Sequence, residues 1–148
     1  MHAKGAACEC PAFGCVLLPF SRATIRRRRK FWIVKKLGSF LAQAFLQEAS
    51  VNAADCDIHF EISQTADKTA PRVIVETPVD SEYCSARQNA QSQLAKHGFR
   101  LDSQHGGELA QAMPVEITGM AFEDFEHNRG SAQVATIWEL HPAILNIS

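Results

Sequence analysis

Apolar and polar residues alternate along one short segment of the chain, and this alternation predicts a β-strand. In residues 57–63 the apolar side chains fall on one face of an extended chain and the polar side chains fall on the other. The apolar set is Ile58, Phe60 and Ile62, and the polar set is His59 and Glu61. A second strand is predicted over residues 72–76, a β-branched run that ends at Thr77 and Pro78.

The apolar stretch that precedes these strands is open to two interpretations. Residues 31–45 begin with aromatic and β-branched side chains, which favours a long bent strand with a bulge at Gly38. Residues 37–48 are also rich in Leu, Ala and Gln, and by propensity they favour an amphipathic helix. The choice between them decides the first element of the fold.

The second half of the chain predicts one helix and two strands. Tyr83, Ala86, Ala90 and Leu94 recur at helical spacing, and the helix ends at residues 96–98. The polar, glycine-containing residues 101–113 are predicted to form a loop. Strands are predicted over residues 114–122 and 134–140, and residues 143–147 are a possible continuation of the second strand beyond a break at residues 141–142.

The predicted order is therefore strand, strand, strand, helix, strand, strand. This is the order of the five-stranded OB-like barrel, a mainly β fold in which one helix joins the third and fourth strands. An α+β sheet with two helices is the alternative. The predicted core is Ile58, Phe60, Ile62, Val73, Val75, Leu94, Ile117 and Ile137.

Basic and acidic residues are distributed unevenly along the chain. Residues 1–36 contain nine Lys or Arg and one Glu, whereas residues 37–148 contain six Lys or Arg and fifteen Asp or Glu, a formal charge of −9. Such an asymmetry is typical of a basic tail on an acidic domain. We predict a disordered basic leader over residues 1–30 and a single barrel domain over residues 31–148. No run reaches the roughly 18 apolar residues of a transmembrane helix.

The spacing of the five cysteines does not indicate a disulfide framework. Cys84 falls within the predicted helix, where a small buried side chain is expected. This pattern favours a reducing, cytoplasmic compartment. Export is the alternative, because residues 28–33 and the apolar residues 37–46 resemble a twin-arginine signal, although residues 51–53 make a poor cleavage site.

Four motifs carry a resemblance to a group of small bacterial proteins of uncharacterised activity. These proteins have an aspartate-rich turn before a His-containing strand, and they end in a Glu-Leu-His-Pro signature. The matching segments of this chain are residues 55–59, 75–78, 117–124 and 135–142. The resemblance covers about residues 33–148. It implies an OB-like fold and no particular activity.

A looser resemblance is to the thermonuclease family, which is also built on an OB-fold. The residues that carry it are 55–58 and 72–78. This resemblance implies that Asp57, Glu76 and Thr77 hold Ca²⁺ and that Arg72 clamps a phosphate. Hard oxygen ligands at two strand ends suit Ca²⁺ or Mg²⁺.

The chain departs from the thermonuclease pattern in several ways. Arg72 stands one residue closer to the acidic residue Glu76 than the family pattern requires, which places it on the other face of the strand. Cys56 replaces a glycine, and Glu76 replaces a shorter aspartate. No residue clearly supplies the family's second arginine or its general-base glutamate. The alternative interpretation is structural: Asp55 and Asp57 shape a turn, and Glu76 caps the helix that follows.

Two histidines form an alternative candidate metal site. His59 and His141 are predicted to face one another across the barrel, joined by Glu139 or Asp57, and such a set suits a transition metal. The structural alternative is that His141 and Pro142 form a turn. The basic block at the N-terminus is a candidate for nucleic-acid binding through phosphate contacts. It consists of Arg26, Arg27, Arg28, Arg29 and Lys30.

These observations favour a non-enzymatic binding or accessory module with an unidentified ligand. A divalent-metal-dependent phosphodiesterase that uses Asp57, Glu76 and Arg72 is the second hypothesis. A nucleic-acid binder that relies on residues 26–30 is the third, and the acidic domain argues against it because strand binding needs a basic groove.

Overall fold

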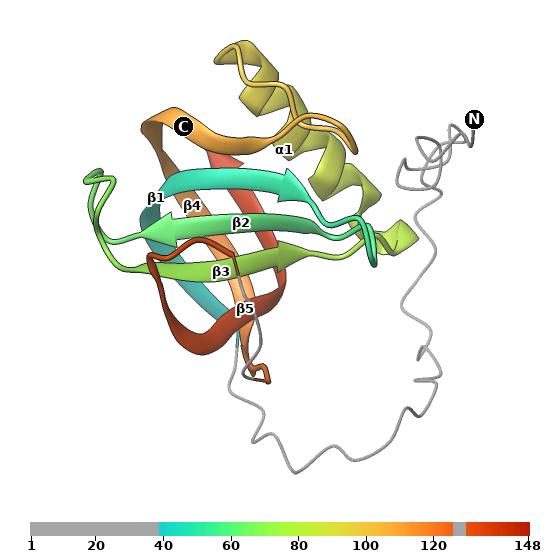
Figure 1. Cartoon of the computed structure of the whole chain (residues 1–148). Coiled ribbons are helices and arrows are strands. Elements are labelled where there is room, and N and C mark those ends of the chain that lie inside the picture. Colours follow the sequence, from blue (N-terminus) through green and yellow to red (C-terminus); the bar gives the residue numbers. More distant parts are fainter. Residues whose placement is uncertain (1–38, 126–129) are drawn as a thin grey trace.

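Five strands close into a barrel in which neighbouring strands follow the order β1-β2-β3-β5-β4. The computed structural model describes residues 39–125 and 130–148 (Figure 1). Strand β4 pairs back onto β1, and β3 pairs with β5 in parallel. The predicted five-stranded OB-like barrel is thus confirmed. Its elements are β1 (Ser39–Val51), β2 (Ile58–Ser63), β3 (Arg72–Thr77), α1 (Cys84–Lys96), β4 (Gly107–Glu123) and β5 (Val134–Ile147).

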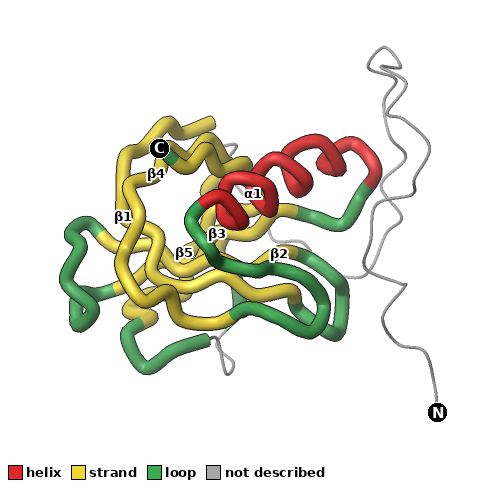
Figure 2. The backbone as a smooth tube through the Cα atoms, turned by 90° about the horizontal axis from the view of Figure 1, so that it is seen from above, coloured by secondary structure: helices red, strands yellow, loops and turns green. Residues whose placement is uncertain are grey.

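A single α-helix occurs among the described residues, so the two-helix α+β alternative is wrong. A short 3-10 turn, η1 (Ser81–Tyr83), leads directly into α1, which lies against one side of the ring of strands and packs on β5 (Figure 2). Ala90 and Leu94 of the helix are buried in the core, as their spacing predicted. No helix in the described part of the chain is long and apolar enough to cross a membrane.

The alternation in β2 and β3 places most of their apolar residues inside the barrel, whereas Ile74 shares the outer face of β3 with Glu76. Ile58 and Phe60 of β2 and Val75 of β3 have no solvent-exposed surface, and all three belong to the core cluster. Since successive side chains of a strand point to opposite faces, the polar residues of β2 lie on the outer face of the sheet. That outer face carries the candidate site described below.

Strand β1 spans 39–51, and the helical alternative for residues 37–48 is wrong. The segment pairs with β2 on one side and with β4 on the other, so sheet contacts override its helical propensity. Its irregularity lies between Leu46 and Glu48, whereas Gly38 is outside the described residues. Leu46 and Ala49 are fully buried. Residues 39–46 of the segment that resembles a twin-arginine signal form part of this strand, and residues 28–38 lie outside the described residues.

Strand β4 begins at Gly107, inside the segment that was predicted as a loop. Gly106 and Gly107 favour a loop in the sequence, but Gly106 instead allows the start of β4 to approach the backbone of β1 closely. A Cβ atom on Gly106 would lie 2.7 Å from the backbone oxygen of Ala49 in β1. Leu109 follows as a buried core residue. The prediction failed because glycine was interpreted as a chain breaker.

The prediction that Ile137 belongs to the core is wrong, since 37 % of its surface is exposed. The cause is an irregularity in the pairing of β4 with β5 between Gly119 and Ala121. After the irregularity, the odd-numbered residues Ala143, Leu145 and Ile147 of β5 face inward. Before it, the even-numbered Leu140 packs on the core, so the odd-numbered Ile137 faces outward. A shift of one residue exchanges the two faces of a strand. Strand β5 also continues through residues 141–142.

Candidate metal centre on strands β2, β3 and β5

Strand pairing brings three separate chain segments together on the outer face of the barrel. His59 of β2 lies directly opposite Glu76 of β3. Glu139 of β5 lies opposite Ile74 of β3, and β5 reaches His141 two residues later. The parallel pairing of β3 with β5 therefore joins the two sites that the sequence suggested separately.

Glu76 lies between the two imidazoles. Its Oε2 atom is 2.9 Å from Nδ1 of His141, and its Oε1 atom is 3.3 Å from Nδ1 of His59. Nδ1 of His141 also lies 3.6 Å from Oε1 of Glu139. Nε2 of His141 lies 3.9 Å from Oδ2 of Asp57. Each side chain in this group is at least half-buried, so the charges interact with little screening.

Asp57, Glu76 and His141 form a convergent set of possible metal ligands. Each offers one ligand atom, and the three atoms lie within 4.8 Å of one another. Two of these atoms are carboxylate oxygens and the third is an imidazole nitrogen. Such a mixed donor set can coordinate a divalent metal ion. We call these three residues the Asp57 triad.

The aspartate of the triad is held by the turn that precedes β2. The backbone amide of Asp57 donates to Oδ1 of Asp55, and the backbone amide of Val79 donates to Oδ1 of Asp57 at 2.8 Å. The first of these bonds confirms that Asp55 shapes the turn. Only Oδ2 of Asp57 then faces His141. Burial raises the pKa of Asp57, because the carboxylate loses water contacts.

The electrostatics of the cluster favour charged imidazoles and charged carboxylates. Burial raises the pKa of Glu76, but hydrogen bonds from His141 and His59 outweigh burial and lower the pKa to about 2. Burial lowers the pKa of His59, yet hydrogen bonds to Glu61 and Glu76 raise it to about 9. Hydrogen bonds to Glu139 and Glu76 raise the pKa of His141 to about 10. A metal ion at His141 would therefore have to displace a proton.

Not all of the predicted ligands join the cluster. Thr77 lies on the opposite face of β3 from Glu76, and its hydroxyl donates to the carbonyl oxygen of Ala143 at 2.6 Å inside the protein. The basic block, residues 26–30, lies outside the described residues. Phe122 was not predicted as part of the site, but the centroid of its ring lies 5.9 Å from that of the His141 ring.

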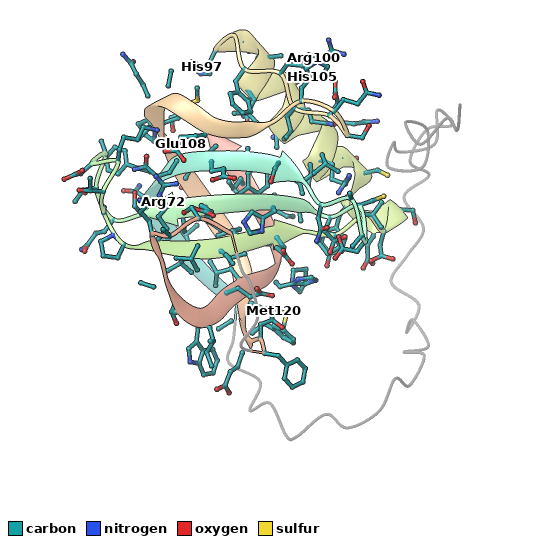
Figure 3. All side chains as sticks on the ribbon, viewed as in Figure 1. Arg72, His97, Arg100, His105, Glu108 and Met120 are labelled. Carbon is teal, nitrogen blue, oxygen red and sulfur yellow. The ribbon has the colours of Figure 1, made fainter. Side chains whose placement is uncertain are left out.

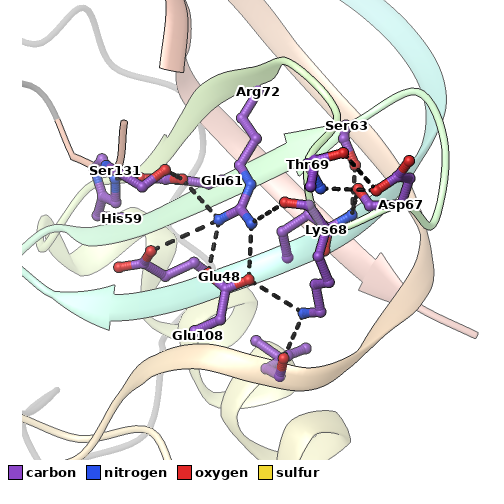
Figure 4. Close-up of polar contacts among 12 residues, drawn as sticks. Glu48, His59, Glu61, Ser63, Asp67, Lys68, Thr69, Arg72, Glu108 and Ser131 are labelled. Atoms are coloured by element: carbon purple, nitrogen blue, oxygen red, sulfur yellow. Dashed lines mark hydrogen bonds and ion pairs between the residues drawn. The ribbon is translucent and has the colours of Figure 1, made fainter. Parts of the chain in front are cut away.

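Arg72 is the centre of a buried ionic network next to the triad (Figure 4). Its guanidinium donates to both carboxylate oxygens of Glu108 at 2.7 Å, to Oε2 of Glu61 at 3.1 Å and to the carbonyl oxygen of Lys68 at 3.0 Å. Only 2 % of the Arg72 surface is exposed. Arg72 and Glu108 lie next to each other at one side of the barrel (Figure 3), and they tie β3 to β4.

Glu61 connects this network with the triad. It accepts hydrogen bonds from the backbone amide and the hydroxyl of Ser131, in the connection between β4 and β5. Its Oε1 atom is also 3.7 Å from Nε2 of His59, which in turn contacts Glu76. The alternation of β2 had already placed Glu61 beside His59. Nothing in the sequence indicated the contact with Ser131.

The state of the described cysteines differs from the prediction. Cys56 and Cys84, the two cysteines among the described residues, are both disulfide-bonded. Cys84 is buried, as predicted, but it is not a free thiol. Cys56 lies in the turn before Asp57, and Cys84 is the first residue of α1. The spacing of the cysteines in the sequence did not indicate that either one is disulfide-bonded.

No protein-family model matches this chain, and no curated protein or solved structure matches it either. The case for function therefore rests on the geometry of the chain itself.

Proposed function

We propose that the protein is a binding module whose ligand is a divalent transition-metal cation held by the Asp57 triad. The observation that carries this proposal is the convergence of three ligand atoms within 4.8 Å. Asp57, Glu76 and His141 come from a turn and two different strands, so their meeting depends on the whole barrel. The site lies on the outer face of β2 and β3, a face that OB-folds use for ligands.

The donor set favours a transition metal over Ca²⁺ or Mg²⁺. Calcium and magnesium prefer oxygen ligands throughout, whereas imidazole suits zinc, nickel, iron and similar ions. His141 supplies such a nitrogen, and His59 lies on the far side of Glu76 as a hydrogen-bond partner. Partners of this kind orient ligating carboxylates in known metal sites. The proposal thus combines the carboxylate site and the histidine site into one.

The phosphodiesterase alternative needs a cationic group that is free to bind a phosphate. Arg72 is buried, and its two terminal nitrogens donate to Glu108, Glu61 and Lys68. A phosphate would have to compete with two carboxylates for the same guanidinium. This arrangement supports a binding module more than an enzyme that uses Arg72.

Thermal unfolding with and without metal tests the proposal. A cation that binds only the folded state at about 100 times its Kd should stabilise it by about 2.7 kcal/mol, or roughly 10 °C. We expect this shift with Zn²⁺ or Mn²⁺ and a smaller one with Ca²⁺ or Mg²⁺. Glu76→Gln and His141→Gln should each abolish it.

Two matched variants serve as controls. Glu116→Gln and His105→Gln make the same chemical changes at exposed positions outside the triad, and they should keep the full shift. Figure 3 places His105 near Arg100, away from Arg72. The proposal is wrong if no cation raises Tm, or if the shift survives in Glu76→Gln. Metal-dependent cleavage of single-stranded DNA, lost in the same variants, would favour the phosphodiesterase.

A further inference from the structure

His141 presents its two ring nitrogens to different carboxylates. Nδ1 lies 2.9 Å from Oε2 of Glu76 and 3.6 Å from Oε1 of Glu139, whereas Nε2 lies 3.9 Å from Oδ2 of Asp57. The two sides of the ring therefore differ in the number of carboxylates and in their spacing. Because the hydrogen bond at one imidazole nitrogen decides whether the other is free to bind a metal ion, this difference indicates which nitrogen the ion takes.

The spacing on the Nε2 side of His141 fits a metal ion. Two atoms that each bind one ion at about 2.1 Å lie at most about 4.2 Å apart, and a tetrahedral arrangement places them roughly 3.4 Å apart. The 3.9 Å between Nε2 and Oδ2 of Asp57 falls between these values and is too long for a hydrogen bond. Oδ1 of Asp57 accepts from the backbone amide of Val79, so an ion at Oδ2 leaves that bond intact.

The spacing on the Nδ1 side fits a hydrogen bond instead. Oε2 of Glu76 lies at an ordinary hydrogen-bond distance from Nδ1, and Oε1 of Glu76 is in contact with His59. An ion at Nε2 lies on the other side of the imidazole ring, so Oε2 has to leave Nδ1 in order to bind it. A histidine that binds a metal ion almost always donates its other N–H to a carboxylate, a carbonyl or water. Nδ1 therefore needs a second acceptor in the metal-bound state.

Glu139 fits the role of that second acceptor. It comes from β5, two residues before His141, and its Oε1 atom is 3.6 Å from Nδ1, so a short movement of the side chain brings it within hydrogen-bond distance. Only 5 % of the Glu139 surface is exposed. Little water competes for the position, and a hydrogen bond to a carboxylate is strong in such a buried setting.

We propose that His141 binds the metal ion through Nε2 and that Glu139 is the positioning residue that accepts the hydrogen bond from Nδ1. The proton stays on Nδ1, and only its acceptor changes, from Glu76 in the metal-free state to Glu139 in the metal-bound state. This inference rests on the proposed function, in which Asp57, Glu76 and His141 are the ligands. Glu139 contacts a ligand and not the ion.

Nuclear magnetic resonance shows directly which nitrogen carries the ion. The full chain is labelled with ¹⁵N-histidine, and two-bond ¹H–¹⁵N spectra are recorded without metal and with saturating Zn²⁺. Signals that are lost in His141→Gln belong to His141. We expect Zn²⁺ on Nε2 and a retained proton on Nδ1. Zn²⁺ on Nδ1 would overturn the inference, and this measurement needs no variant of Glu139.

Variants of Glu139 test the acceptor. Affinity is measured with Mn²⁺, whose free form is detected by electron paramagnetic resonance and which prefers oxygen ligands to the thiolates of free cysteines. Glu139→Ala removes the acceptor and should weaken binding about 10–100-fold, as for other groups that orient metal ligands. Glu139→Gln keeps an acceptor oxygen without the charge and should weaken binding less. Equal losses in the two variants would show an effect of charge alone and overturn the inference.

The Nδ1 proton gives a readout that a merely structural role of Glu139 would not move. In Zn²⁺-bound wild type this proton should exchange slowly with water, and in Zn²⁺-bound Glu139→Ala it should exchange faster, because its acceptor is missing. An unchanged exchange rate would contradict the assignment.

Glu123→Ala and Glu123→Gln are the matched controls. Glu123 is exposed on β4, opposite Trp138, the residue before Glu139. Both controls should keep the wild-type Mn²⁺ affinity. If wild type binds neither Mn²⁺ nor Zn²⁺, the proposed function itself fails. If wild type binds an ion and the Glu139 variants match the controls, the proposed function stands and this inference is overturned.

Discussion

Arg72 lies within 4 Å of three carboxylates of the described residues, those of Glu48, Glu61 and Glu108, where β3 begins. Its guanidinium is buried between Glu61 and Glu108. Removing one member of a buried ionic group is strongly destabilising, because the remaining charges lose their partner. Lys68 also pairs with Glu108, but both of these side chains are partly exposed, and exposed pairs contribute little.

We therefore expect Arg72→Met to lower the free energy of unfolding by about 3–5 kcal/mol. Lys68→Met is the matched control, and it should change the same quantity by less than about 1 kcal/mol. Urea unfolding monitored by fluorescence measures both. Equal effects of the two substitutions would contradict a structural role for the Arg72 network.

Glu61 gives a prediction for acid stability. Burial raises its pKa, but hydrogen bonds from His59, Ser131 and Arg72 outweigh burial and lower the pKa to about 2. A carboxyl group whose pKa is lower in the folded state stabilises the fold above its unfolded pKa, and this stabilisation is lost as pH falls through the folded pKa. For Glu61 the window runs from about 4.5 down to about 2.

Urea midpoints measured between pH 2 and pH 7, a range that spans this window, check the prediction. Wild type should lose stability steeply as pH falls, and Glu61→Gln should show a shallower slope on top of its lower stability at neutral pH. Glu116→Gln, at an exposed position, should retain the wild-type slope. Parallel profiles for wild type and Glu61→Gln would contradict the assignment.

At the scale of the elements, β4 and β5 approach each other closely beside the irregularity in their pairing between Gly119 and Ala121. A Cβ atom on Gly119 of β4 would lie 2.6 Å from Cβ of Ala143 in β5, closer than two carbon atoms can pack. Gly119→Ala should therefore lower stability by about 1–3 kcal/mol through overpacking. Ala143→Gly should restore part of the loss in the double variant. A double-mutant cycle without coupling would contradict this contact.

The strands that could be predicted from the sequence are those whose pattern is local. Alternation in β2 and the β-branched run of β3 gave their bounds to within a residue, because one face of each contacts the core. Strand β1 was ambiguous, since its helical propensity conflicts with pairing on both edges. Ile137 was misplaced because the exchange of faces in β5 arises from pairing with β4, which no local pattern shows.

At the scale of the whole molecule, the candidate site was predictable in its parts and not in its assembly. Asp57, Glu76, His59 and His141 were all singled out by strand ends and turns. These residues come together only because β3 pairs in parallel with β5. The two strands are separated along the chain by α1 and β4. The sequence does not indicate Glu108, because the polar, glycine-containing residues around it favour a loop.

The complete barrel lies within residues 39–148, which gives a prediction for the basic leader. Deletion of residues 1–30 removes none of the strands, so Tm should stay within a few degrees of the wild-type value. Deletion of residues 1–53 also removes β1 and should abolish cooperative unfolding. Differential scanning calorimetry distinguishes the two results. A collapse of Tm in the shorter deletion would show that the leader contributes to the core.

The most direct test of a metal site is to locate the metal by diffraction. Crystals of the full chain soaked in Zn²⁺ or Mn²⁺ should give an anomalous difference peak among Asp57, Glu76 and His141, at roughly 2.0–2.3 Å from the ligand atoms. The peak should disappear in Glu76→Gln crystals that are soaked in the same way. A site without a peak, or a peak confined to the exposed pair of His105 and Asp102, would contradict the account.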